Sequence, residues 1–126
     1  MTTRTQPGDR VLLSRASFAK LLLALCADGF QLVGPTVRDG AIVHAPIDGV
    51  EDLAEGWTEI QEAGTYRLRR REDRTLFGYT LGPQSWKQFF FVPTLQLWRA
   101  RRQDGSFVVL EKTRAVPRLA LIGALV

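Results

Sequence analysis

The chain has 126 residues, of which 45% are hydrophobic, and it carries 17 basic and 13 acidic side chains. This length and apolar content are typical of one folded domain with one core, and they argue against disorder and low complexity. No apolar run approaches the ~20 residues that span a bilayer, and the N-terminus lacks the hydrophobic stretch of a signal peptide. We therefore expect a cytoplasmic protein that does not contact the membrane, with a flexible leader at residues 1–9 and a single domain at residues 10–126.

The net charge of +4 does not narrow the class of binding partner, because a mild basic excess is compatible with a nucleic acid, an acidic protein or no specific partner. The lone cysteine is more informative. Cys26 cannot form an internal disulfide, and it cannot supply the four thiolates that an iron–sulfur cluster usually takes. Its position beside Leu22 and Leu25 predicts a buried, inert thiol.

The first elements follow from capping and periodicity. Residues 11–13 are apolar and predict a short buried strand, and Ser14 then predicts a helix N-cap. Apolar side chains recur at helical spacing over residues 15–28, and Gly29 is a typical residue just beyond a helix end. The apolar positions of this helix are Phe18, Leu21, Leu22 and Leu25.

Hairpins are predicted after this helix. Residues 30–33 and 41–45 favour strands, and Asp39-Gly40 between them is a strong turn sequence. Residues 48–64 are acidic and rich in glycine, which indicates a surface connection with one helical turn, held by Leu53 and Trp57.

A second hairpin is predicted from residues 66–71 and 75–81 around Glu72-Asp73-Arg74, with a bulge at Gly78. Gly82-Pro83 then predicts the start of a short helix that ends at Pro93, because proline is tolerated in the first helical turn. Its aromatic residues, which we expect to be mostly core, are Trp86, Phe89, Phe90 and Phe91.

The last elements are a hairpin of residues 95–101 and 106–110 with Asp104-Gly105 in its turn, and a strand at residues 119–123. The total is two helices and about seven short strands. The expected fold class is α+β, as a single domain with a mainly antiparallel sheet.

Residues for catalysis or metal binding are scarce. His44 is the one histidine and has no partner at triad or ligand spacing, so we interpret it as structural or exposed. The carboxylates of residues 48–64 have no nearby cysteine or further histidine, which favours a solvated acidic surface over a metal site. The sequence indicates no catalytic set and no metal site in this chain.

Arginines form the main electrostatic feature. On a strand, Arg67, Arg69 and Arg71 point to one face and Leu68 and Arg70 to the other. A second basic group contains Arg99, Arg101 and Arg102. Such a stripe suits a solvated sheet edge, the docking of an acidic partner or a cofactor phosphate, or a nucleic acid, which is the least favoured of the three.

Three segments in the same order resemble one protein family. They are Val-Gly-Pro-Thr-Val-Arg-Asp-Gly-Ala-Ile at residues 33–42, Leu-Gly-Pro-Gln-Ser-Trp-Lys-Gln-Phe at residues 81–89, and Leu-Ala-Leu-Ile-Gly at residues 119–123. Together they resemble the N-terminal region of the 4Fe-4S hydrogenase and sulfhydrogenase β subunits, which are related to one of the subunits of anaerobic sulfite reductase. The similarity extends over nearly the whole chain.

The resemblance implies a scaffolding and docking domain of an iron–sulfur electron-transfer subunit. In that family, the strand that resembles residues 119–123 continues into an Arg-x-Cys-Asp stretch and a ferredoxin-like part with two 4Fe-4S clusters, whereas this sequence reads Ala124-Leu125-Val126. We therefore expect no cofactor in this chain, and partners among the hydrogenase or reductase and flavoprotein subunits of a redox complex.

Contacts with a neighbouring cluster or flavin are expected at Ser85, Trp86 and Lys87, because a helix start offers free amides and Lys87 adds a positive charge. Two alternatives stay open at this point: a piece of a longer redox subunit, or a free-standing basic module that binds a protein or single-stranded nucleic acid.

Overall fold

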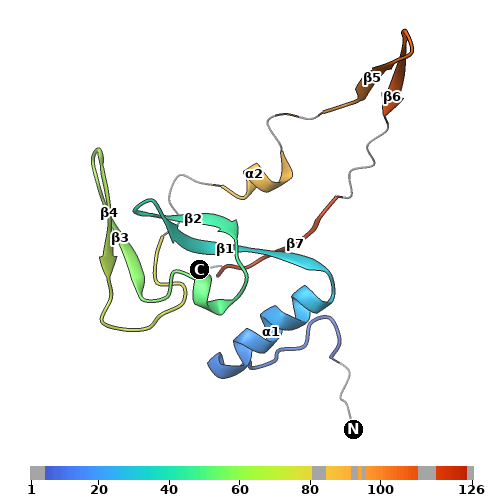
Figure 1. Cartoon of the computed structure of the whole chain (residues 1–126). Helices are drawn as coiled ribbons and strands as arrows, with labels where there is room; N and C mark the ends of the chain where they lie inside the picture. Colours follow the sequence, from blue (N-terminus) through green and yellow to red (C-terminus); the bar gives the residue numbers. More distant parts are fainter. Residues whose placement is uncertain (1–4, 81–84, 92–93, 95, 111–115, 125–126) are drawn as a thin grey trace.

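The computed structural model describes residues 5–80, 85–91, 94, 96–110 and 116–124 (Figure 1). In these residues, two helices and seven strands are arranged in mostly antiparallel sheets, which confirms the prediction of a small single-domain α+β fold. Within these residues, no helix combines the length and the apolar character that crossing a bilayer requires.

Helix α1, Arg15–Ala27, begins and ends where its capping residues predict. The Ser14 hydroxyl accepts a hydrogen bond from the Ser17 amide at 3.2 Å, which satisfies one free amide of the first turn. Gly29 follows the helix at a φ of +83°, a conformation that glycine adopts without steric cost. Leu22 is the most buried side chain of the helix, with 1% of its surface exposed.

Two predictions around α1 are wrong. Residues 11–13 form no strand, and Leu12 is fully exposed, because no strand of the described chain lies beside this segment to share its hydrogen bonds. Cys26 is exposed rather than buried. The buried stripe of α1 runs through Phe18, Leu22 and Leu25, and Cys26 lies one residue beyond it, about 100° around the helix.

The main sheet has three strands in the order β2-β1-β7, with β1 at Phe30–Arg38, β2 at Ala41–Pro46 and β7 at Arg118–Leu121. The predicted turn is confirmed, since Asp39 and Gly40 both have positive φ. Strands β1 and β2 are antiparallel, whereas β7 runs parallel to β1.

Strand β1 is longer than the predicted segment and continues through Gly34 and Pro35. The Ile47 amide donates to the Leu32 carbonyl at 3.1 Å, which sets the alternation of hydrogen-bonded pairs along the hairpin. Pro35 is opposite His44 in a pair that does not exchange hydrogen bonds, so its missing N–H weakens no bond to β2. Its carbonyl accepts from the Ala54 amide at 3.0 Å.

The acidic connection contains the predicted helical turn, the 3₁₀ helix η1 at Val50–Asp52, but it also contains strand β3 at Trp57–Glu62. Strand β4, Thr65–Arg70, pairs antiparallel with β3. The predicted hairpin of residues 66–71 with 75–81 is therefore wrong: residues 75–80 form no strand, and residue 81 lies outside the described residues. Gly64, with a φ of +72°, permits the tight β3–β4 turn that replaces it.

A small core lies between α1, the main sheet and η1. Its buried members are Leu22, Leu32, Ile47 and Leu53. Gly34 lies against two of them, because a Cβ atom there would be 2.8 Å from Ile47 Cδ1 and 3.1 Å from Leu53 Cδ2. The backbone of β1 thus approaches the core more closely than any side chain would allow.

Helix α2, Lys87–Phe90, is shorter than predicted, and its expected boundaries at Gly82-Pro83 and Pro93 lie outside the described residues. The hairpin of β5, Arg99–Gln103, and β6, Ser106–Leu110, has the predicted turn at Asp104-Gly105. Figure 1 shows this hairpin extending away from the rest of the described chain.

Candidate functional site

The β3–β4 hairpin has two faces of different character. Residues directly opposite each other in an antiparallel pair share a face, so Arg70 lies with Trp57, and Arg69 lies with Thr58. The Arg70 guanidinium stacks 4.3 Å from the centre of the Trp57 ring. Tyr66 belongs to the same inner face, and its hydroxyl accepts a hydrogen bond from the Ile42 amide at the edge of β2 at 3.2 Å.

The outer face carries the predicted basic stripe in a shorter form. Arg67 and Arg69 alternate with the inner residues of β4, and both are exposed. Neither forms an ion pair within the part of the chain that the structure describes. Ile60, opposite Arg67, adds an exposed apolar side chain to this face.

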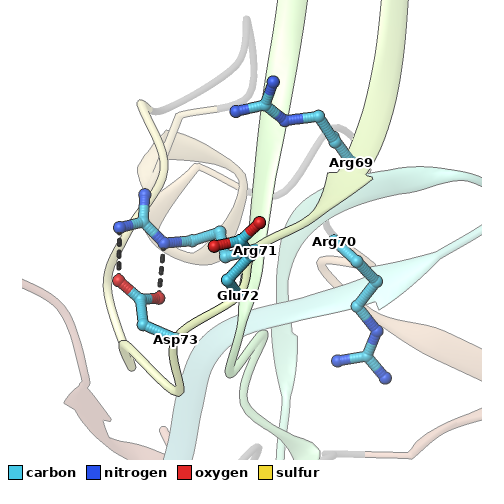
Figure 2. Close-up of a pocket in the computed structure, with 5 residues that line it drawn as sticks. All are labelled: Arg69, Arg70, Arg71, Glu72 and Asp73. Atoms are coloured by element: carbon cyan, nitrogen blue, oxygen red, sulfur yellow. Dashed lines mark hydrogen bonds and ion pairs between the residues drawn. The ribbon is translucent and has the colours of Figure 1, made fainter.

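Arg71 does not extend the stripe, because β4 ends one residue earlier. Its Nε and Nη2 atoms donate to the two carboxylate oxygens of Asp73 at 2.7 and 2.6 Å, as Figure 2 shows. Arg71 Nη1 also donates to the Gly78 carbonyl at 3.4 Å. The guanidinium beside Asp73 holds the pKa of this carboxyl well below its usual range, chiefly through the hydrogen bonds from Arg71.

A hollow of about 650 Å³ lies along the end of β4 (Figure 2). It is lined by consecutive residues, Arg69, Arg70, Arg71, Glu72 and Asp73. Arg71 is paired with Asp73 and Arg70 is stacked on Trp57, so Arg69 is the arginine of this hollow whose guanidinium has no ion pair, hydrogen bond or ring contact among the described residues.

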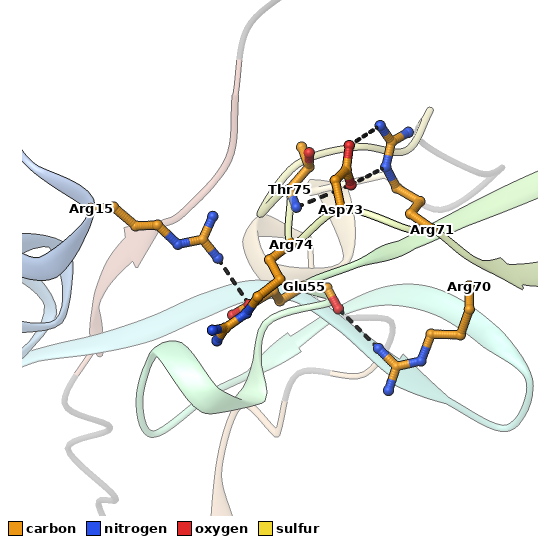
Figure 3. A network of polar contacts seen from close by, with 7 residues as sticks. All are labelled: Arg15, Glu55, Arg70, Arg71, Asp73, Arg74 and Thr75. Carbon is orange, nitrogen blue, oxygen red and sulfur yellow. Dashed lines mark hydrogen bonds and ion pairs between the residues drawn. The ribbon is translucent and has the colours of Figure 1, made fainter.

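Glu55 contacts three arginines through its carboxylate and its backbone carbonyl, as Figure 3 shows. Its carboxylate pairs with Arg15 at 2.9 Å and with Arg74, while its carbonyl accepts a hydrogen bond from Arg70 at 3.3 Å. The sequence placed Glu55 on a solvated acidic surface. Its role became visible only from the fold, because Arg15 and Arg74 are distant from it in the chain.

Trp86 and His44 form a second structured region. The indole of Trp86 stacks on the His44 imidazole, with ring centres 3.7 Å apart and planes inclined by 16°. Gln88 Nε2 donates to the His44 carbonyl at 3.2 Å, which attaches α2 to β2. His44 is 6% exposed, and burial lowers its pKa from the ordinary value of 6.5. It is a structural histidine.

Ser85 and Lys87 flank this stack and are exposed. The Ser85 hydroxyl accepts a hydrogen bond from the Lys87 amide at 3.1 Å, so this amide at the start of α2 already has a partner. Of the predicted site residues, Trp86 contacts β2 through its stack on His44, whereas the arginine-bearing strand β4 is joined to β2 by Tyr66, which was not predicted as a site residue. Trp86 serves the fold, whereas Ser85 and Lys87 remain at the surface.

Groups for chemistry are few among the described residues. No three histidine, cysteine or carboxylate side chains there lie close enough to hold a metal ion. Burial, together with the charge of Glu59, raises the pKa of Tyr79 to about 12, so this phenol keeps its proton at neutral pH.

Comparisons of this chain with protein-family models, with curated proteins and with solved structures found no match. The resemblance drawn from residues 33–42, 81–89 and 119–123 stays a prediction.

Proposed function

We propose that this chain is a non-catalytic docking domain that binds an acidic surface of another protein subunit through the outer face of β4. The observation that carries the proposal is the exposure of Arg67 and Arg69 side by side on a sheet face that turns away from the β1–β2 hairpin. Two guanidinium groups on one rigid strand match carboxylates at a fixed spacing, because each can donate two parallel hydrogen bonds.

The contacts of the neighbouring arginines support this interpretation. Arg70 stacks on Trp57, Arg71 pairs with Asp73, and Arg74 pairs with Glu55. These contacts fix the hairpin in place and leave Arg67 and Arg69 for a partner. A preformed basic face steers an acidic partner towards it before contact and raises the association rate.

The family resemblance supplies the class of partner. It implies hydrogenase or sulfur- and sulfite-reductase subunits together with a flavoprotein, and 4Fe-4S clusters in a ferredoxin-like part of the family. In such a complex, the exposed Ser85 and Lys87 next to the Trp86 stack would face a neighbouring subunit or its cofactor. The proposed role for this domain is positioning, with electron transfer carried out elsewhere in the complex.

Anaerobic isolation of the tagged chain from its source cells tests the proposal. We expect it to recover subunits that contain iron and sulfide or flavin, and the double variant Arg67→Glu with Arg69→Glu to reduce their recovery roughly tenfold at physiological salt. A matched control is Arg10→Glu with Lys20→Glu, which changes the net charge equally at two other exposed positions. Equal recovery with both variants, or recovery of no cofactor-bearing subunit, would contradict the proposal.

A further inference from the structure

The β5–β6 hairpin, together with Leu97 and Trp98 before it, forms a projecting arm that is apolar and unpaired. Strands β5 and β6 pair with each other and with no other strand of the described chain. Trp98 is 68% exposed and Phe107 is 74% exposed. A two-stranded hairpin is marginally stable alone in water, so an arm with this much exposed apolar surface is expected to pack on another surface.

Both faces of the arm combine apolar and basic side chains. Arg102 lies opposite Phe107 on one face, and Arg101 lies opposite Val108 on the other. Residues 97–110 contain three arginines and one aspartate, a net charge of +2 from 3 − 1. Two arms would therefore repel each other, and the surface that receives an arm must be apolar with acidic groups nearby.

Another part of this same chain has these properties. A groove of about 380 Å³ lies between the start of α1 and residues 75–77. Its apolar lining is Leu13, Phe18, Leu76 and Phe77, and Ser14, Arg15 and Thr75 complete it.

Acidic residues are adjacent to this groove. Arg15, in its lining, pairs with Glu55 at 2.9 Å, so the groove borders the acidic segment. Residues 45–66 contain six carboxylates and no basic side chain, and Asp48, Glu51 and Asp52 are exposed around η1. Glu55 is already paired with Arg15 and Arg74, so the groove complements the apolar side chains of the arm, and the exposed carboxylates around η1 complement its arginines.

We infer that the arm of one copy of this chain docks into the α1 groove of a second copy, with Trp98 or Phe107 in the groove and the arm arginines against the acidic segment. A chain does not reach its own groove with its own arm in this structure, because the arm extends away from α1 (Figure 1). A two-fold arrangement makes the contact twice, since each copy offers one arm and one groove. Aliphatic Val108 and Val109, both exposed, favour a protein surface over a nucleic acid.

Sedimentation velocity on the isolated chain tests this inference independently of the redox partners. We expect a dimer at micromolar concentrations in low salt that dissociates at about 0.5 M salt, where surface charges are screened. Trp98→Ser with Phe107→Ser should give monomers, and so should Leu13→Asp, which places a charge in the groove. Leu12→Asp, a fully exposed neighbour outside the groove lining, should stay dimeric.

Mixing the two monomeric variants gives the sharpest result. The arm variant keeps its groove and Leu13→Asp keeps its arm, so the mixture should form a heterodimer through one intact contact. Circular dichroism checks that each variant is folded. If the serine double variant of the arm is unfolded, Trp98→Gln with Phe107→Gln is used in its place. A chain that is monomeric at every concentration, a dimer that survives the arm substitutions, or an arm that binds single-stranded nucleic acid and not a second copy would overturn the inference.

Discussion

The imidazole of His44 and the indole of Trp86 stack with their ring centres 3.7 Å apart, which joins β2 to the segment that carries α2. His44 comes from the middle of an antiparallel hairpin, and Trp86 is 42 residues further along the chain. The stack covers one face of a buried histidine whose Nδ1 atom has no hydrogen-bond partner among the described residues. Removing the indole would therefore expose one face of the imidazole ring to water.

Replacing Trp86 by alanine is expected to lower the free energy of unfolding by about 2 kcal/mol, through lost stacking and lost apolar burial. Urea denaturation followed by circular dichroism measures the change. Trp98→Ala is the matched control, because Trp98 is 68% exposed and its removal should change the stability of the isolated monomer by less than about 0.5 kcal/mol. Equal effects of the two substitutions would show that Trp86 is not packed on His44.

The stability of the fold should also depend on pH through His44. Burial lowers its pKa below 6.5, so the unfolded chain binds a proton more readily than the folded chain does. The free energy of unfolding is therefore not reduced by His44 above pH 6.5, and it decreases as the pH falls from 6.5 towards the lower pKa of the folded state.

Thermal unfolding at a series of pH values measures this effect. The sequence has one histidine, so the variant His44→Phe, which keeps an aromatic ring against Trp86, should remove the loss of stability just below pH 6.5. A wild-type profile that stays flat in that range, or one that His44→Phe leaves unchanged, would contradict the assignment.

Gly34→Ala should destabilise the chain by about 2 kcal/mol, because the new methyl group would overlap Ile47 and force the core to shift. Gly123→Ala provides the control. A Cβ atom there would lie 3.5 Å from Trp86 Cζ2, which is ordinary contact, and its cost should stay below about 0.5 kcal/mol. Chemical denaturation of both variants gives the comparison, and a tolerated Gly34→Ala would mean that β1 does not approach the core so closely.

Asp73→Asn should release the Arg71 guanidinium and add it to the exposed basic surface around Arg69. We expect this variant to elute from a heparin column at higher salt than the wild type. Asp104→Asn changes the net charge by the same amount in the β5–β6 turn, at a positive φ that asparagine tolerates. If the two variants shift equally, net charge alone explains retention and Arg71 is not held by Asp73.

Local interactions account for what could be predicted of the fold and the site. The N-cap of α1 at Ser14 and the turns at Asp39-Gly40 and Asp104-Gly105 depend on residues within four positions of each other, so the sequence identifies them. The side-by-side exposure of Arg67 and Arg69 follows from the two-residue period of a strand. These features would be the same in many tertiary arrangements.

Contacts between distant segments decided the rest. Strand β4 pairs with β3 rather than with residues 75–80, and β7 joins β1 in parallel across more than 80 residues, because pairing depends on which strands the core brings together. Arg71 is bound to Asp73 because β4 ends at Arg70, and Cys26 is exposed because the buried stripe of α1 faces the sheet along Leu22 and Leu25. The sequence by itself determined the helix, the turns and the alternation of side chains. The tertiary structure alone decided the strand partners and which arginines of the described chain are held in ion pairs, since both depend on what is adjacent in space.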